Sequence, residues 1–175
     1  MMNTANSVSN INHCRSFGAV VGENPRLLIL GSMPGGESLR QGQYYAFRAN
    51  AFWRITGALF GFRPDLPYSE RLDALRRGGV ALWDVLKECE RDGSLDSNIR
   101  APVPNDIARL LADHPSIRLI ACNGGTAFRY FGRFVKPQLR AGYRIVRLPS
   151  SSPAAARMSF EEKLAVWRRL LLSGE

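Results

Sequence analysis

Short apolar runs bounded by turn residues recur along this chain, and each has the length of one strand. The first reads RLLILG at residues 26–31, between Asn24-Pro25 and a loop rich in proline and glycine. A run without polar alternation is typical of a strand buried on both faces of a parallel sheet. The same pattern predicts further strands at residues 80–83, 117–122 and 143–148.

Between these strands, apolar residues recur at helical spacing and are bounded by helix start and stop signals. The predicted helices cover residues 49–60, a segment from Ser69 to Gly78-Gly79, a segment capped by Asn105, a segment carrying Phe128, Tyr130 and Phe131, and a last helix that opens with the capping box of Ser159 and Glu162. Residues 88–98 form a polar stretch in which the pattern indicates no element. Residues 1–22 lack periodicity, so we expect a flexible N-terminal arm followed by one domain over residues 23–175.

Strands that alternate with helices predict right-handed crossovers and a three-layer α/β/α fold around a four-stranded, mostly parallel sheet. The 175 residues are enough for one compact domain and too few for two ordinary ones. Ligands of such sheets bind beyond the carboxyl ends of the strands. This rule selects the loops at residues 31–36, 84–98, 123–125 and 148–157.

The charge of the chain is concentrated in one segment. The formal net charge is +9, and no acidic residue occurs between Asp113 and Glu161. The cations of this segment are Arg118, Arg129, Arg133, Lys136, Arg140, Arg144, Arg147 and Arg157. Arginine binds phosphate through a planar fork, so this clustering favours a nucleic acid partner. The alternative is a solvated surface that reflects a general preference for arginine.

Other residues exclude several classes of protein. The three cysteines are far apart and the chain has only two histidines, so we expect no disulfide framework, no zinc site and no iron–sulfur cluster. No window approaches the length of an apolar membrane span, and we therefore expect a cytoplasmic protein that does not bind membranes.

The loop from Gly31 to Gly36 follows the first strand but matches neither a dinucleotide-binding fingerprint nor a P-loop. Read alone, it is a turn. Tyr44-Tyr45 and then Asn50 lie just before a helix, where aromatic residues can be core and an asparagine can be a helix cap.

Several ordered motifs together resemble the uracil-DNA glycosylase superfamily, most closely its DNA-deoxyinosine (hypoxanthine) glycosylase branch. They read LILGSMPG, YY, NAFW, LWDV, GSLDSNI, NGG and LPSSSPA, and they span about residues 20–167. The resemblance implies an enzyme without cofactor or metal that flips a deaminated base out of DNA and hydrolyses its N-glycosidic bond. A base inside the stack is out of reach of side chains, so such chemistry requires flipping.

The resemblance also implies roles for individual residues. Gly31, Ser32 and Met33 would lie against the base and sugar, Tyr45 would stack on the flipped base, and the Asn123 amide would bind the base edge. Met33 stands where sister families carry a side chain that positions water, and Asn50 is the expected substitute as the catalytic residue. Because an amide is a weak base, catalysis would depend on positioning and electrostatic stabilisation.

The last motif implies contacts with the DNA backbone. Ser150, Ser151 and Ser152 would bind phosphates, and Arg157 would fill the gap in the duplex or clamp a phosphate. Leu148 stands where many relatives have a histidine, so no imidazole is available to stabilise the leaving base. Asp84 and Asp96 are candidate supporting carboxylates, but surface or capping roles are the stronger expectation for both.

Three alternatives stay open at this stage. The chain could be a DNA-binding module of the same fold without catalysis, or a glycosylase specific for uracil or mismatches. A serine hydrolase is disfavoured, because no G-x-S-x-G motif occurs and no histidine lies near the serines. The favoured reading is a monomeric glycosylase whose partner is DNA and which is associated with the nucleoid.

Overall fold

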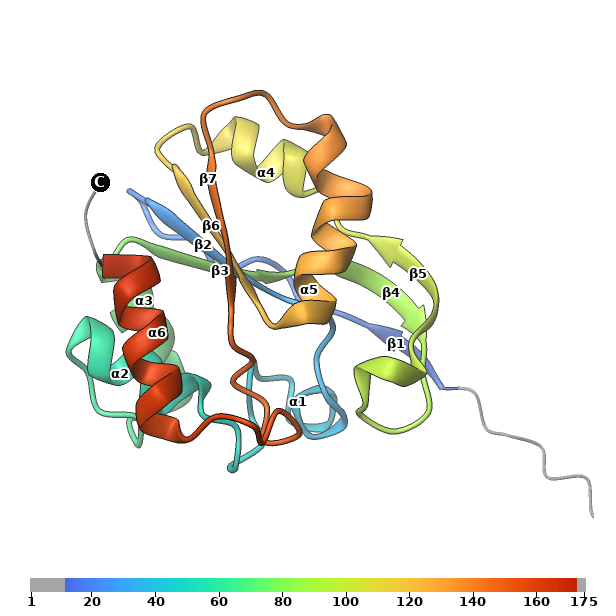
Figure 1. Cartoon of the computed structure of the whole chain (residues 1–175), viewed down its shortest axis with the longest axis horizontal. Helices are drawn as coiled ribbons and strands as arrows, with labels where there is room; N and C mark the ends of the chain where they lie inside the picture. The colour runs from blue at the N-terminus through green and yellow to red at the C-terminus, as the bar shows by residue number, and fades with distance from the viewer. Residues whose placement is uncertain (1–11, 173–175) are drawn as a thin grey trace, which may run out of the picture.

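The computed structural model describes residues 12–172, which fold around two β-sheets (Figure 1). Four strands form a parallel sheet in the order β3-β2-β6-β7, and three form an antiparallel sheet in the order β1-β4-β5. The strands are β1 (His13–Arg15), β2 (Leu27–Gly31), β3 (Val80–Asp84), β4 (Leu86–Glu90), β5 (Arg100–Pro104), β6 (Leu119–Asn123) and β7 (Arg144–Leu148). The predicted four-stranded parallel sheet is confirmed.

Alternate residues of the central strand face two helical layers. Leu28 and Leu30 pack with α4 and α5, whereas Leu27 and Ile29 pack with α2, α3 and α6. The helices are α1 (Gly36–Gln41), α2 (Phe52–Phe60), α3 (Tyr68–Arg77), α4 (Ile107–Asp113), α5 (Gly125–Tyr130) and α6 (Phe160–Leu172). This confirms the α/β class and accounts for the unbroken apolar run in β2, because both of its faces are covered.

Two of the helix starts test the capping predictions. In α6, Ser159 Oγ accepts from the Glu162 amide and Glu162 accepts from the Ser159 amide, so the predicted capping box is confirmed. In α4 the cap is Asp106, whose carboxylate accepts from the Arg109 amide. The prediction that Asn105 caps this helix is wrong. Its amide instead donates to the Asp84 and Leu86 carbonyls and stabilises the turn between β3 and β4.

The antiparallel sheet was not predicted. Its strand β4 reads LKECE, and its pairing with β5 contains register shifts, so no regular alternation marks it in the sequence. Its first strand, β1, also corrects the predicted N-terminal arm. Cys14 is buried opposite Cys89, and Val20 bridges to Leu82 of the parallel sheet. The prediction of a flexible arm is therefore wrong for residues 12–22. Residues 1–11 lie outside the described part of the chain.

The carboxyl ends of the parallel strands share one edge of the sheet with α1 and with the loop that joins β7 to α6 (Figure 1). Gly31 pairs with Asp84, and Asn123 pairs with Leu148 at this edge. The last residues of all four strands are thus neighbours, and the loops that follow them build a single site.

Candidate active site

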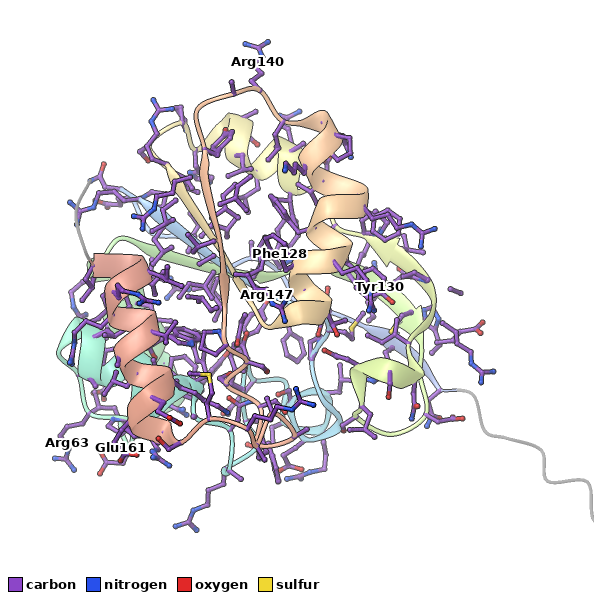
Figure 2. The ribbon with its side chains drawn as sticks, in the orientation of Figure 1. Arg63, Phe128, Tyr130, Arg140, Arg147 and Glu161 are labelled. Atoms are coloured by element: carbon purple, nitrogen blue, oxygen red, sulfur yellow. The ribbon has the colours of Figure 1, made fainter. Side chains whose placement is uncertain are left out.

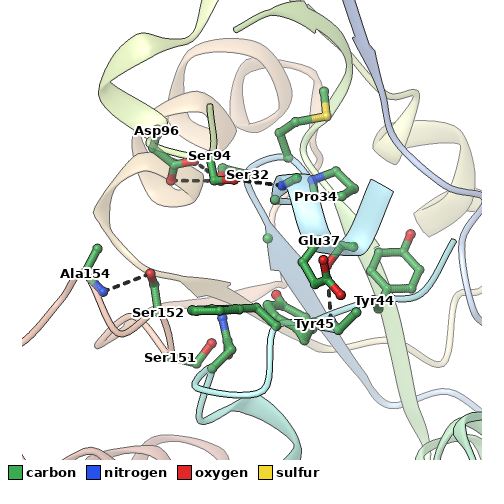
Figure 3. A pocket seen from close by; sticks show the side chains of 18 of the residues that line it. Ser32, Pro34, Glu37, Tyr44, Tyr45, Ser94, Asp96, Ser151, Ser152 and Ala154 are labelled. Atoms are coloured by element: carbon green, nitrogen blue, oxygen red, sulfur yellow. Dashed lines mark hydrogen bonds between the residues drawn. The ribbon is translucent and has the colours of Figure 1, made fainter. Parts of the chain in front are cut away.

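A cavity of about 900 Å³ opens at the carboxyl edge of the parallel sheet (Figure 3). Every site residue predicted from the sequence except Arg157 lines it: Gly31, Ser32, Met33, Tyr45, Asn50, Asn123, Ser150, Ser151 and Ser152. These residues come from four separate loops. The fold therefore brings together side chains that are far apart in the sequence, at the place where the strand-end rule puts a ligand.

Tyr45 is held in a strained and specific position. Its backbone has φ 52°, a left-handed conformation that is rare for aromatic residues. Its ring stacks on the buried Phe52 ring, with the centroids 3.9 Å apart and the planes 13° apart. Tyr44 beside it is a core residue, whose hydroxyl donates to the Gly18 carbonyl. The support from Phe52 leaves the Tyr45 ring as part of the cavity wall.

Asn123 organises the floor of the cavity. Its amide nitrogen donates to the Tyr45 hydroxyl at 3.1 Å and to Ser151 Oγ at 2.8 Å, and its carbonyl oxygen accepts from the Ser151 amide at 2.9 Å. These bonds use both amide protons, so only one lone pair of the oxygen is left for a base. Asn123 is therefore first a residue that positions Tyr45 and Ser151.

Asn50 joins the cavity to the start of α2. Its side-chain oxygen accepts from the Phe52 amide at 3.0 Å, as in a helix cap. The next amide, of Ala51, donates to the Ser151 carbonyl at 2.9 Å. The first bond fixes the orientation of the Asn50 amide, and the second ties its loop to the serine loop. A capping role and a role in the cavity are thus compatible at this position.

One wall of the cavity comes from residues 94–96, which lie in one of the loops that the strand-end rule selected. Ser32 donates to both carboxylate oxygens of Asp96 at 2.9 Å, and the Gly36 amide donates to Ser94 Oγ at 2.8 Å (Figure 3). Burial raises the pKa of the Asp96 carboxyl, while the Ser32 hydrogen bond works against that rise. Ser32 therefore lines the cavity and also ties its own loop to the segment at residues 94–96.

Asp84 is the acidic residue that the sequence analysis misjudged. It was expected at the surface or in a cap, but it is only 3% exposed and lines the cavity. Burial, with a further contribution from the Asp96 charge, raises the pKa of Asp84 to about 8, and Arg91 partly offsets this. At neutral pH this carboxyl therefore carries a proton. The sequence signal was its place at the end of a buried strand, in one of the selected loops.

The serine loop is a chain of short turns that ends near a buried lysine. The Ser152 amide donates to Ser150 Oγ and the Ala154 amide donates to Ser152 Oγ, both at 3.2 Å. The buried Lys163 ammonium donates to the Ser152 carbonyl at 3.3 Å, and burial lowers its pKa. Gly124 has φ +97° and lies so close to this loop that a Cβ would meet Ser150 Cβ at 3.0 Å. Lys163 of α6 and Gly124, which follows β6, thus hold the serine loop in place.

The cations of the acid-free segment are exposed but do not form one patch around the cavity. Within residues 12–172 none of the eight forms an ion pair with a carboxylate. Arg147 lies against Gly125 near the carboxyl edge, whereas Arg140 projects from the opposite end of the molecule (Figure 2). Arg157 is exposed between the serine loop and α6. The predicted clustering in sequence is only partly a clustering in space.

The rim of the cavity carries a large apolar side chain that the sequence analysis passed over. Phe47, between Tyr45 and Asn50, lines the cavity and is 52% exposed. Arg48 beside it is also exposed. A phenylalanine exposed at the mouth of the cavity suits contact with an apolar surface such as a base step.

Within residues 12–172, no group of three or more histidine, cysteine or acidic side chains is arranged to hold a metal ion. In the same part of the chain, no helix has the length and apolar character needed to cross a membrane.

Comparison with known proteins identifies relatives over most of the chain. Residues 18–171 match the family model of the uracil DNA glycosylase superfamily. A hypoxanthine DNA glycosylase of Methanosarcina acetivorans is 43% identical over 147 residues, which cover 83% of this chain and 90% of that protein. A hypoxanthine DNA glycosylase of Methanosarcina barkeri is 37% identical over 155 residues, or 87% and 94% of the two chains.

A solved structure has the same architecture. The solution NMR structure of a candidate uracil DNA glycosylase from Methanosarcina acetivorans matches with a TM-score of 0.76 and 39% sequence identity. The match covers 91% of this chain and 99% of that one. The parallel sheet and its surrounding helices are thus shared with a solved relative.

Proposed function

This chain belongs to the uracil DNA glycosylase superfamily and is a DNA glycosylase, and we propose that the base it removes is hypoxanthine, from deoxyinosine in DNA. The observation that carries this proposal is the convergence of Tyr45, Asn50 and Asn123 on one cavity of about 900 Å³. The two hypoxanthine DNA glycosylases that resemble the chain support the choice of base.

The cavity suits a base that has left the duplex. A deaminated base in a mispair costs less to unstack than a paired one, which favours its capture in such a cavity. The Tyr45 ring, already supported by Phe52, would stack on the flipped base. The backbone from Gly31 to Met33 would lie along the base and sugar, and the free lone pair of Asn123 would accept from a base N–H.

Asn50 would hold the attacking water at the anomeric carbon. Its side-chain oxygen spends one lone pair on the Phe52 amide and keeps the other for a water proton. An oriented water and an oxocarbenium-like transition state need positioning and electrostatic stabilisation rather than a strong base. Neither His13 nor His114 lines the cavity, so this chemistry proceeds without an imidazole.

The DNA backbone would bind around the cavity mouth. Ser150 and Ser152 offer hydroxyls there, and the Lys163 ammonium lies beneath their loop. Arg147 and Arg157 extend this surface with exposed guanidinium groups that suit phosphates. Phe47, rather than Arg157, is the side chain best placed to fill the gap that the flipped base leaves.

A glycosylase of this kind needs one protein chain and a DNA strand. We therefore propose that the protein acts as a monomer, in the cytoplasm and in association with the nucleoid. Exposed cations near the cavity mouth, such as Arg147 and Arg157, would give it weak, salt-sensitive affinity for undamaged DNA, which lets it search for damage.

Cleavage of labelled duplexes tests the proposed substrate. Duplexes carrying one deoxyinosine or one deoxyuridine are incubated with the protein, and alkali then breaks the strand at each abasic site. We expect breaks at deoxyinosine. Breaks at deoxyuridine alone would identify a uracil-specific enzyme, and tight salt-sensitive binding with no breaks would identify a DNA-binding module without catalysis.

A further inference from the structure

One buried acid in the cavity has no role in the chemistry described so far. Asp84 ends β3 at the cavity floor, and among residues 12–172 nothing hydrogen-bonds its Oδ2. A buried polar atom without a partner is costly, so such groups are rare unless a ligand or a reaction uses them.

The Asp84 carboxyl lies next to Gly31 of the central strand. The Asp84 backbone pairs with Gly31 in the sheet, and its carbonyl accepts from the Asn105 amide at 2.9 Å. A Cβ at Gly31 would collide with Asp84 Oδ1 and would lie 2.9 Å from the Tyr45 hydroxyl. The missing side chain of Gly31 therefore leaves room for both the Asp84 carboxyl and the Tyr45 hydroxyl.

The charges around Asp84 favour its protonated form. Burial is the main cause of its raised pKa, and the Asp96 carboxyl adds to it because a second negative charge nearby is disfavoured. The phenols of Tyr44, Tyr45 and Tyr68 also face Asp84, but their raised pKa values keep them neutral, so they add no charge. Arg91 opposes this rise in the pKa, but its guanidinium is already bound to the Pro34 and Gly93 carbonyls. Buried Asp84 accordingly has a raised pKa and holds a proton that it can release.

We propose that Asp84 is the general acid that protonates a ring nitrogen of the departing purine. This inference rests on the proposed function. A base stacked on the Tyr45 ring would have an edge beside the Tyr45 hydroxyl, and the Asp84 carboxyl borders the same space at Gly31. A proton on the purine makes it a better leaving group, which replaces the imidazole that the cavity lacks.

The step balances without any further reactant. The Asp84 proton moves to N7 or N3 of hypoxanthine, and the electron pair of the C1′–N9 bond goes to the base as that bond breaks. The oxygen of the water held by Asn50 bonds to C1′. The proton that this water loses returns to the Asp84 carboxylate, so one water is consumed and the acid is regenerated.

The first test compares Asp84→Asn with the native protein in single-turnover excision of hypoxanthine. The substitution keeps the shape and a donor but removes the transferable proton, and we expect the rate to fall about 10²–10³-fold. The native rate should fall about tenfold per pH unit once Asp84 ionises, while the variant rate should be flat with pH. The exposed Asp65→Asn serves as the matched control and should keep native activity.

The second test needs no variant. Duplexes with 7-deaza-2′-deoxyinosine or 3-deaza-2′-deoxyinosine lack one ring nitrogen each, and one of them should be cleaved by the native protein as slowly as deoxyinosine is by Asp84→Asn. Binding of each duplex is measured alongside, to separate lost affinity from lost chemistry.

The outcomes separate this inference from the proposed function. A native protein that excises hypoxanthine while Asp84→Asn keeps its rate within about twofold overturns the general acid and leaves the function standing. Native rates on both deaza duplexes overturn it as well, even if the variant does not fold. Failure of the native protein to release hypoxanthine overturns the proposed function and this inference with it.

Discussion

At the carboxyl end of the parallel sheet the polar side chains are hydrogen-bonded to one another around a cavity, whereas at the amino end they are exposed cations. Asn123, Ser151 and Asp84 are all buried at the first end. Arg26, Arg118 and Arg144 flank the starts of β2, β6 and β7 at the second, and all three are exposed.

The two ends of the sheet thus differ in role, and a count of charges along the sequence does not distinguish catalysis from DNA affinity. Preorganised, partly desolvated groups lower a reaction barrier, while exposed cations add affinity that salt screens. The acid-free segment supplies residues to both ends of the sheet, so a run of charge in the sequence does not by itself locate the site. Changes at the cavity should therefore alter rates, and changes at the far end should alter neither rate nor damage recognition.

The largest effect is expected from Asn50→Ala. Loss of the amide that would orient water should reduce single-turnover excision about 10²–10³-fold, the usual range for a positioned catalytic dipole. Affinity for the duplex should change little, because Asn50 is not an exposed cation. The control is the exposed Asn24→Ala, and an Asn50→Ala rate near the native value would remove Asn50 from the chemistry.

The buried Asp84 carboxyl should also lower the stability of the folded protein as the pH rises. Its pKa of about 8 lies above that of an unfolded aspartate, so the folded state binds the extra proton and loses stability as pH rises from about 4 to about 8. Asp84→Asn should therefore melt at a temperature about 3–8 °C above the native protein at pH 8, and about equal to it at pH 4. Thermal unfolding at a series of pH values measures this, and a pH-independent difference contradicts a buried neutral acid.

Tyr45 should contribute through its ring more than through its hydroxyl. Tyr45→Ala removes the stacking surface, which is worth about 1–3 kcal/mol, or about 5–150-fold in excision. Tyr45→Phe keeps the ring and loses only the acceptor for Asn123, so a smaller loss is expected. Measuring both on the same duplex tests the assignment, which fails if the two variants lose equally.

Substitutions of Arg147 and Arg140 compare the two ends of the molecule directly, and their effects on DNA affinity are expected to be the smallest. Arg147→Gln should lower the slope of log affinity against log salt by about one, as expected for one lost phosphate contact. Arg140→Gln, at the far end, should leave the slope unchanged. Equal changes in the two variants would mean that DNA covers both ends of the sheet.

Much of the fold could be predicted because both faces of the parallel sheet are covered. Unbroken apolar runs such as LLILG are the direct consequence of that burial, and the strand-end rule then located the cavity. The antiparallel sheet could not be predicted, because β4 and β5 are half-exposed and irregular in register, and β5 also contains prolines. Such strands form through pairing with a neighbour rather than through a pattern of their own.

The site was harder to predict wherever tertiary contacts decide a side chain's state. An asparagine at the end of a buried strand can bind the edge of a base, and this was the role expected of Asn123. Its partners Tyr45 and Ser151, however, come from loops far away in the sequence. In the sequence, Asp84 resembles any acidic residue at a strand end, and only its tertiary burial and the neighbouring Asp96 charge raise its pKa. Asn105 and Asp106 are adjacent polar residues with opposite fates, because one reaches back to β3 and the other faces its own helix.

The most direct test of the central claim is the amount of free hypoxanthine released from a duplex with a single deoxyinosine, quantified chromatographically for the native protein and for Asn50→Ala. We predict one equivalent of hypoxanthine per duplex from the native protein and a rate at least about 10²-fold lower from the variant. No free base from the native protein, or equal release by both proteins, would contradict the assignment of this cavity as the site of hypoxanthine excision.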